Sequence, residues 1–377
     1  MEYKRCTLGV WDTTVPGISF DESGISNYAK KQVELMRRYP RGETGENHWN
    51  TILEKIKRAG FKKEYDCIIG LSGGTDSCYL LHMAKEWGLR PLAVSVDNGF
   101  NSQISLENLK NITEKLNIEL KTYVIDSGKL KDAHVSYMRA SLPWIDCPTD
   151  MAITSTLMRY AKKYGVKHVL TGRDFRSEGK QPLLWTASDD KQLRYLVKKF
   201  SGHKLKNYPA ISPWEMGYLT TVCKIRRLNP FYYLDYEKAE AQELLIDKYG
   251  WKYYGEHHHE NEFTKFTLSY WLYEKFKIDK RIITYSGQVM NGNISRNEAI
   301  RILSNKPYDA LNIENDIDSI CEKLGMAKKE LDILMTSPNK NVFDYPSRLN
   351  FVRKHKRLST FVIRKILKYD ALFLDQL

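Results

Sequence analysis

A glycine-rich turn between a strand pattern and a helical pattern constrains the fold of this chain more than any other feature. The apolar run 65–71 leads directly into Ser72, Gly73, Gly74, Thr75, Asp76 and Ser77, and a helical pattern follows over 76–87. Such a turn presents free backbone N–H groups and the positive end of a helix to an anion. The two glycines permit backbone torsions and a close approach that a side chain would prevent. We therefore predict that these residues bind pyrophosphate, with Asp76, the only carboxylate of the loop, available to a metal ion.

The loop is not a Walker A motif, because Gly-x-x-x-x-Gly-Lys-Ser/Thr does not occur in the chain. A serine- and glycine-rich turn in front of an ordinary helix is the alternative interpretation. The preceding strand, the Asp76-Ser77 continuation and the helix in register favour a phosphate site.

Short apolar strands alternate with helices after residue 65. The pattern predicts strands at 65–71, 91–97, 119–126 and 167–171, separated by helices at 76–87, 105–116 and 150–164. This alternation indicates an α/β fold, a doubly wound parallel sheet with helices on both faces. Ligands of such sheets bind beyond the carboxyl ends of the strands, where Ser72, Asp97, Asp126 and Gly172 fall. We expect Asp97 and Gly172 to contact a nucleotide, with a plain Asn-Gly turn at 98–99 as the alternative for Asp97.

Length and pattern divide the chain into three predicted parts. A chain of 377 residues exceeds the usual size of a single core. We predict an irregular segment at 1–45 with a helix at 27–38 and a linker at 41–45, a nucleotide-binding domain at 46–205, and a helical substrate or partner region at 206–377. No strand is expected after about residue 200. Helices are expected at 236–249, 263–276, 296–304 and 313–335, the third starting with a capping box, Ser295 and Glu298.

Composition limits the partners and the location. No apolar run approaches 18 residues, and the charged start lacks a signal-peptide core, so we expect no membrane span. The six cysteines form no CxxC pair, which indicates reduced thiols and a cytoplasmic location. A net charge of +13 suits nucleic acid, an acidic membrane surface or phosphate-bearing small molecules. The basic run 353–357 is either a polyanion site or a solvated helix face.

Asp174 follows the fourth predicted strand within Thr171-Gly172-Arg173-Asp174. Mg²⁺ commonly takes one or two carboxylates together with phosphate oxygens. We therefore predict Asp174 as a second magnesium ligand opposite Asp76. A turn with a surface salt bridge is the alternative.

Three adjacent histidines, 257–259, stand in the segment 251–260. A zinc site is not expected there, because adjacent residues rarely converge on one ion and no fourth ligand stands at a familiar spacing. We predict instead that His258 or Glu260 contacts substrate or transfers protons. A solvated polar loop is the alternative.

These residues together resemble a known superfamily. The loop 72–77 is similar to the SGGxDS signature of the ATP pyrophosphatase (PP-loop) superfamily, whose members cleave ATP to AMP and pyrophosphate. Blocks at 12–24, 250–266 and 286–299 resemble one branch, the N-acetyl sugar amidotransferases of bacterial surface-polysaccharide pathways such as lipopolysaccharide O-antigen biosynthesis. The last two blocks are the more specific, because the PP-loop is common to all branches.

The resemblance implies an adenine nucleotide alpha hydrolase-like fold and the conversion of a sugar acetamido group to an acetamidino group. An O-adenylyl imidate would form from ATP with Mg²⁺, and ammonia from a glutaminase partner would displace AMP. The substrate would be a nucleotide-activated N-acetyl sugar. Asp76, His258 and Glu260 would be catalytic, and Lys265 and Arg296 would contact the sugar. We expect His258 and Glu260 to lie outside the sheet domain, at the sugar half of the reaction.

One departure from the family concerns zinc. The family's N-terminal segment commonly carries two CxxC pairs that look built for zinc, and the matching positions here are Cys6, Gly9, Ser26 and Ala29. One thiol cannot hold a structural zinc ion, which typically takes four ligands. We therefore expect no zinc in this chain.

Two other functions stay open. A tRNA-modifying PP-loop enzyme would suit the charge of +13, but thiolating members usually rely on paired cysteines, so nucleic acid is not the expected partner. A nucleotide-binding subunit without catalysis would suit the missing cysteines, but the intact loop 72–77 argues against it.

Overall fold

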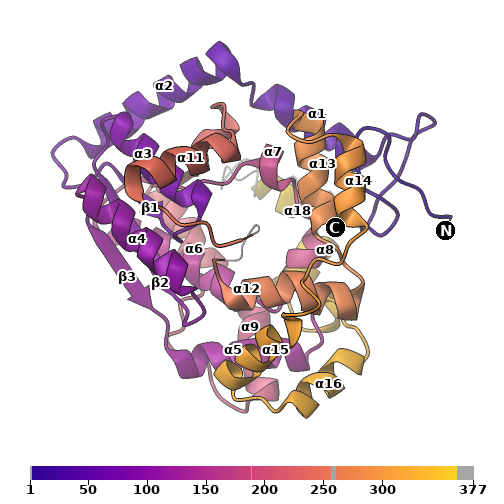
Figure 1. The fold of residues 1–377 in the computed structure, drawn as a ribbon. Coiled ribbons are helices and arrows are strands. Elements are labelled where there is room, and N and C mark those ends of the chain that lie inside the picture. The colour runs from indigo at the N-terminus through magenta and orange to yellow at the C-terminus, as the bar shows by residue number, and fades with distance from the viewer. Residues whose placement is uncertain (1, 188, 256–259, 363–377) are drawn as a thin grey trace.

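Five parallel strands form the sheet whose carboxyl edge carries the glycine-rich loop. In the computed structural model, which describes residues 2–187, 189–255 and 260–362, the strand order is β3-β2-β1-β4-β5. The strands are β1 (Cys67–Gly70), β2 (Pro91–Asp97), β3 (Leu120–Val124), β4 (His168–Leu170) and β5 (Arg226–Leu228). Ile68 of β1 stands opposite Leu92 of β2 and Val169 of β4. The predicted parallel α/β sheet is confirmed (Figure 1).

Helices cover both faces of this sheet, because successive strand residues point to opposite sides and both sides are apolar. Ile69 of β1 belongs to the core formed with α2 (Gly42–Gly60), α3 (Thr75–Glu86), α4 (Gln103–Leu116) and α11 (Lys238–Tyr249). Its neighbour Ile68 belongs to the opposite core, formed with α6 (Cys147–Lys163). The sheet is therefore doubly wound.

A third core, formed mainly by helices, lies beside the sheet. It contains buried aromatic residues such as Phe263 and Trp271, and draws on α5 (Ser127–Arg139), α9 (Asp190–Phe200), α12 (Glu262–Phe266), the π-helix η3 (Thr267–Lys275), α15 (Ile313–Leu324) and α16 (Lys328–Thr336). The other helices of the described residues are α1 (Asn27–Arg38), α7 (Phe175–Glu178), α8 (Leu183–Thr186), α10 (Pro213–Gly217), α13 (Arg281–Asn291), α14 (Arg296–Leu303), α17 (Arg348–Lys354) and α18 (Lys356–Phe361), with a short π-helix η1 (Tyr218–Val222) and two 3₁₀-helices, η2 (Pro230–Tyr232) and η4 (Val342–Asp344).

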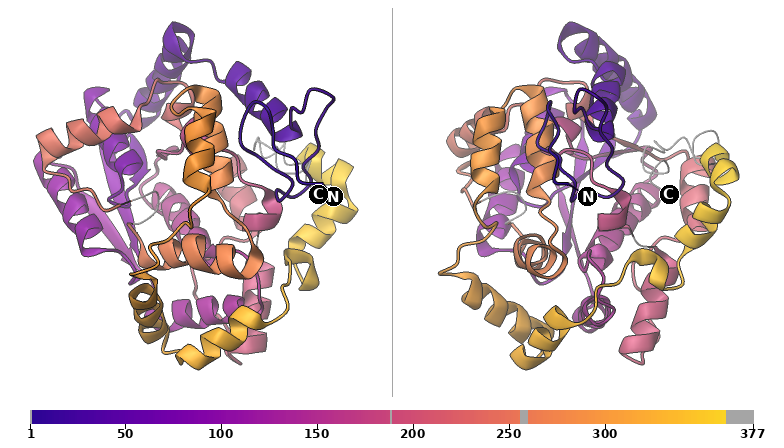
Figure 2. Two further views of the ribbon diagram at one scale, coloured as in Figure 1. Left: turned by 45° about the vertical axis from the view of Figure 1, so that its right-hand side comes forward. Right: turned by 90° about the vertical axis from the view of Figure 1, so that its right-hand side faces the viewer.

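The irregular N-terminal segment packs against the C-terminal helices rather than standing alone. The backbone N–H of Val10 donates to Ser286 Oγ of α13 at 3.0 Å, and α1 also contacts α13. Figure 2 shows the segment lying beside these helices. The first and last thirds of the chain are thus held together.

Two predictions about organisation are wrong. Residues 41–45 are not a linker, because α2 begins at Gly42; an alanine at Gly45 would place its Cβ 2.1 Å from the Tyr233 carbonyl oxygen, so close packing explains this glycine. A strand does follow residue 200, since Arg226–Leu228 forms β5 beside β4. The three-part division of the chain stays a prediction, with β5 showing that the sheet recruits residues beyond 205.

Several helices differ in detail from the predictions. The helix expected over 313–335 is interrupted at Gly325, which adopts a φ of +55°. Helices α5, α9 and α13 were not predicted. Ser295 Oγ accepts the N–H of Glu298 at 3.1 Å, but the Glu298 carboxylate pairs with Arg301, so only half of the capping box forms.

Two surface properties bear on partners. Within the described ranges, no helix has both the length and the apolar character needed to cross a membrane. The basic run 353–357 is exposed on α17 and α18, and both of its interpretations stay open.

Candidate nucleotide site

The glycine-rich loop has the geometry of an anion site. It follows β1 and ends at the N-terminus of α3, with Gly74 as the N-cap. Gly73 adopts a φ of +84°, and a Cβ there would lie 2.3 Å from the Ser105 carbonyl oxygen, so only glycine fits. The predicted strand–turn–helix arrangement is present.

The loop N–H groups are held by neutral hydroxyls. Ser77 Oγ accepts the N–H of Ser72 at 3.2 Å, and Ser72 Oγ accepts that of Gly74 at 3.3 Å. The Tyr254 hydroxyl accepts the N–H of Thr75 at 3.4 Å. A phosphate oxygen is a charged and stronger acceptor, so these donors fit a pyrophosphate that replaces the hydroxyls.

Asp76 lies on the first turn of α3, where its carboxylate is half-buried. The Tyr236 hydroxyl donates a hydrogen bond to Asp76 Oδ1. Tyr236 stacks on Phe231 with ring centroids 4.3 Å apart. Burial, reinforced by the charge of Asp76, raises the pKa of Tyr236, so the hydroxyl keeps its proton and acts as a donor. Tyr236 was not predicted, because nothing near it in the sequence points to a residue 160 positions away.

The neighbouring strands end beside this loop. A Cβ on Gly172 would lie 2.6 Å from the Asp76 carbonyl oxygen, which places the end of β4 against α3. Asp97 ends β2 and accepts the N–H of Gly99 at 2.9 Å. Asp126 stands two residues after the edge strand β3 and caps α5. Nucleotide contacts by Asp97 and Gly172 stay predictions, with Gly172 the nearer to the loop.

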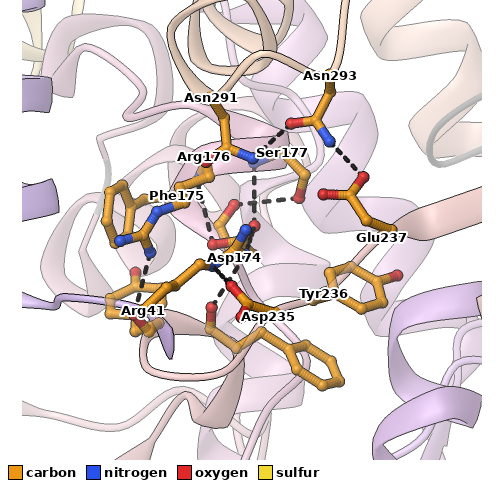
Figure 3. A network of polar contacts seen from close by, with 12 residues as sticks. Arg41, Asp174, Phe175, Arg176, Ser177, Asp235, Tyr236, Glu237, Asn291 and Asn293 are labelled. Atoms are coloured by element: carbon orange, nitrogen blue, oxygen red, sulfur yellow. Dashed lines mark hydrogen bonds and ion pairs between the residues drawn. The ribbon is translucent and has the colours of Figure 1, made fainter. Parts of the chain in front are cut away.

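Asp174 is engaged in a buried ion pair (Figure 3). Its side chain is 1% exposed, and Arg41 Nη2 lies 3.1 Å from Oδ2. The carboxylate also accepts the N–H groups of Arg176 and Ser177 at the start of α7. Burial raises the pKa of Asp174, and the charge of Arg41 opposes this. The magnesium role of Asp174 stays a prediction. The alternative was a salt bridge at the surface, and the structure shows a salt bridge with Arg41 that is buried.

The segment that follows α11 lies against the glycine-rich loop. Trp251 Nε1 donates to the Gly73 carbonyl oxygen at 3.0 Å. A Cβ on Gly74 would lie 2.9 Å from the Tyr254 hydroxyl and 3.3 Å from Glu260 Oε1. The Glu260 carbonyl oxygen accepts the N–H of Ser102 at 2.9 Å. Glu260 therefore stands at the nucleotide loop, and the expectation that it lies away from the sheet domain is wrong.

Other predicted residues are placed as follows. His258 falls outside the described residues. Lys265 pairs with Asp316 at 2.7 Å on the helical core. Arg296 donates to the carbonyl oxygens of Cys6 and Gly9, each at 3.0 Å, so it holds the N-terminal segment. Sugar contacts by Lys265 and Arg296 stay predictions.

The four positions that correspond to family cysteines lie in this N-terminal segment. Cys6 Sγ accepts the N–H of Ser26 at 3.3 Å, and Ser26 Oγ accepts that of Ala29. Among the described residues, no group of three or more His, Cys, Asp or Glu side chains is placed to hold a metal ion. The absence of zinc from the protein stays a prediction.

Comparison with known families matches two regions. The family "Queuosine biosynthesis protein QueC" matches residues 66–177, which contain the loop and its sheet. The family "LPS biosynthesis protein WbpG-like, C-terminal domain" matches residues 260–358. The chain is a PP-loop protein with a WbpG-like C-terminal domain. The two matches support a WbpG-like family of PP-loop ATP pyrophosphatases, and ATP binding by the loop of this chain stays a prediction.

Individual proteins that resemble this chain have low sequence identity to it. The uncharacterized protein MJ1599 of Methanocaldococcus jannaschii is 27% identical over 239 residues, which cover 61% of this chain and 79% of that protein. The NMN synthetase from Francisella tularensis is 18% identical, with a TM-score of 0.28, over 55% of this chain and 93% of that one. The U34-tRNA thiolase NcsA from Methanococcus maripaludis is 14% identical, with a TM-score of 0.29, over 69% and 81%. At these TM-scores the likeness says nothing about the reaction of this chain.

Proposed function

We propose that this chain is an ATP-dependent amidotransferase that converts the acetamido group of a nucleotide-activated N-acetyl sugar to an acetamidino group. One observation supports this most. Residue 260, where the WbpG-like match begins, lies beside Gly74 of the PP-loop. The first residue of the WbpG-like region therefore lies beside the loop that we propose binds ATP.

In the first step the amide oxygen of the sugar attacks the α-phosphorus of ATP, and pyrophosphate leaves. The N–H groups of the loop 72–77 bind the departing pyrophosphate, which is preorganised electrostatic stabilisation. Tyr236 holds the Asp76 carboxylate in place by its hydrogen bond. Asp76 together with phosphate oxygens fits a Mg²⁺ ion, which when bound would offset the charge that develops on pyrophosphate.

In the second step ammonia attacks the imidate carbon, and AMP leaves with the former amide oxygen. Water must be excluded, because hydrolysis of the imidate restores the starting amide. Tyr254 and Glu260 lie directly against the loop, and we propose that their side chains limit the access of water to the imidate. A glutaminase partner would supply the ammonia, and His258 stays our candidate for proton transfer.

The test is the dependence of AMP and pyrophosphate formation on both co-substrates. Purified protein is incubated with ATP, magnesium, ammonium and a panel of UDP- and CMP-linked N-acetyl sugars. We expect AMP only with a suitable sugar, and an amidine product by mass spectrometry only when ammonium is also present. AMP formation at the same rate with and without each of the sugars would contradict the proposal.

The net charge of +13 supports a second candidate, a tRNA-modifying PP-loop enzyme. The same assay decides between the two when RNA replaces the sugar. AMP formation stimulated by RNA and not by any sugar would favour this second candidate.

A further inference from the structure

A cavity of about 280 Å³ lies between α2, α3 and the 3₁₀-helix η2. Four of the residues that line it are aromatic: Trp49 of α2, Tyr79 of α3, Trp87 directly after α3, and Phe231 of η2. No residue of the loop 72–77 belongs to the lining. The cavity is therefore separate from the proposed nucleotide site.

The four rings are held in place as two contacting pairs. The ring centroids of Trp49 and Trp87 are 4.9 Å apart, and those of Tyr79 and Phe231 are 5.8 Å apart. Trp49 and Phe231 are each 1% exposed, so the protein core fixes one ring of each pair. Aromatic rings attract a cation that lies over a ring face within about 6 Å of the centroid, because the face carries negative charge.

Both charged residues that line the cavity are acidic, Glu46 and Asp235. Glu46 is exposed on α2, and within the described part of the chain it forms no ion pair. Asp235 is 67% exposed, and its Oδ1 lies 3.9 Å from Nε of Arg41, whose closer partner is Asp174 at 3.1 Å (Figure 3). The lining is therefore negatively charged in a chain whose net charge is +13.

This lining favours one class of ligand over the others. An anion would be repelled by the two carboxylates, and a neutral apolar molecule would gain nothing from them. A metal ion requires several oxygen, nitrogen or sulfur ligands, and no group of three or more His, Cys, Asp or Glu side chains among the described residues is placed to hold one. An organic cation uses both features, because its apolar groups pack on the rings and its charge is attracted by the ring faces and the carboxylates. The volume is at the lower limit of ligand sites, which suits a small molecule.

We propose that this cavity binds a small organic cation, an ammonium group that carries apolar substituents. The substituents pack against the rings of Tyr79 and Trp87, which are only half-buried, and the charge lies towards Glu46 and Asp235. The inference is independent of the proposed function, since it uses neither the glycine-rich loop nor the WbpG-like region.

The test compares choline with its uncharged isostere, in which a carbon atom replaces the charged nitrogen. Each is titrated into the full chain by isothermal titration calorimetry, with the ionic strength held constant by sodium chloride. Glu46→Gln removes one charge from the lining, Tyr79→Leu removes one ring, and Tyr79→Phe keeps that ring. Glu43→Gln is the matched control, because Glu43 is exposed on the same helix and does not line the cavity.

We expect saturable binding of choline in the millimolar range or tighter, and binding of the isostere that is weaker by roughly fivefold or more. Glu46→Gln should weaken choline binding roughly fivefold, the effect of one charge pair close to water. Tyr79→Leu should weaken it by roughly three- to tenfold, whereas Tyr79→Phe and Glu43→Gln should stay within about twofold of wild type.

Equal affinity for choline and its isostere would overturn the assignment to a cation. Equal affinity of Glu46→Gln and Glu43→Gln for choline would overturn the location in this cavity, and this pair of exposed substitutions keeps the test valid if Tyr79→Leu fails to fold. Absence of saturable choline binding at millimolar concentrations would overturn the site itself.

Discussion

Removing Arg41 should destabilise the protein strongly, because it leaves the Asp174 carboxylate buried without its cation. The two side chains are 13% and 1% exposed, and their atoms are 3.1 Å apart. Loss of one partner from a buried pair costs about 3–5 kcal/mol. Asp174 retains two backbone N–H donors, so we expect Arg41→Met to fall at the lower end, a decrease of about 3 kcal/mol in the free energy of unfolding.

The assay is urea unfolding of wild type, Arg41→Met, Asp174→Asn and the double variant. Asparagine carries no charge to bury, so the double variant should recover most of the loss. Arg301→Met is the control, because Arg301 pairs with Glu298 on the surface, where such a pair contributes about 0–1 kcal/mol.

The pH dependence gives a second signature. Burial raises the pKa of folded Asp174 above its unfolded value, and Arg41→Met should raise it further. Protonation then favours the folded state, so stability is greatest below the ordinary carboxyl pKa and is lost as pH rises through the folded pKa. The decrease in the free energy of unfolding caused by Arg41→Met should therefore be largest at neutral pH and become smaller as the pH falls towards about 4. A deficit below about 0.5 kcal/mol at pH 7 would refute the buried-pair reasoning. Weaker magnesium binding by Asp174→Asn, with unchanged stability, would favour the metal role.

Further predictions concern the site and the N-terminal segment. Asp76→Asn should abolish sugar-dependent AMP formation while the protein stays folded, whereas Glu86→Gln, at the exposed end of the same helix, should leave it unchanged. Elemental analysis should find no stoichiometric zinc, because Gly9, Ser26 and Ala29 offer no side-chain thiol; one zinc per chain would refute this. His258→Ala should reduce amidine formation by roughly 10²–10⁴-fold and change the KM for ATP only a few-fold. A large loss of ATP affinity would instead place His258 at the nucleotide.

Features with a local cause were predictable from the sequence. The strand at 91–97 was predicted with its observed bounds, and the turn after the first strand forms the predicted loop. An apolar run, a glycine pair and a helical period lie within a few residues of one another, so each constrains the next. The parallel sheet follows from the same alternation.

Features with a distant cause were not predictable. Tyr236 meets Asp76 across 160 positions, and Arg41 meets Asp174 across 133. Strand β5 has only three residues, two of them arginine, so no apolar run marks it. Gly45 contributed to the prediction of a flexible linker at 41–45. In the structure it lies so close to the backbone of Tyr233 that α2 has no room for a Cβ at this position.

The position of Glu260 shows how a correct motif can be assigned to the wrong place. Its sequence block is separated from the PP-loop by some 180 residues, which suggested a separate site. The backbone contact between Glu260 and Ser102 instead brings the block to the loop. Only the fold reveals that the two halves of the proposed reaction share one location.

The fate of the amide oxygen tests the central claim most directly. A sugar substrate whose acetamido carbonyl carries a heavy oxygen isotope is incubated with the protein, ATP, magnesium and ammonium, and the AMP is analysed by mass spectrometry. If the amide oxygen attacks ATP and later leaves with AMP, each AMP formed with amidine should carry one heavy oxygen. Unlabelled AMP accompanying amidine formation would contradict activation of the amide as an adenylate.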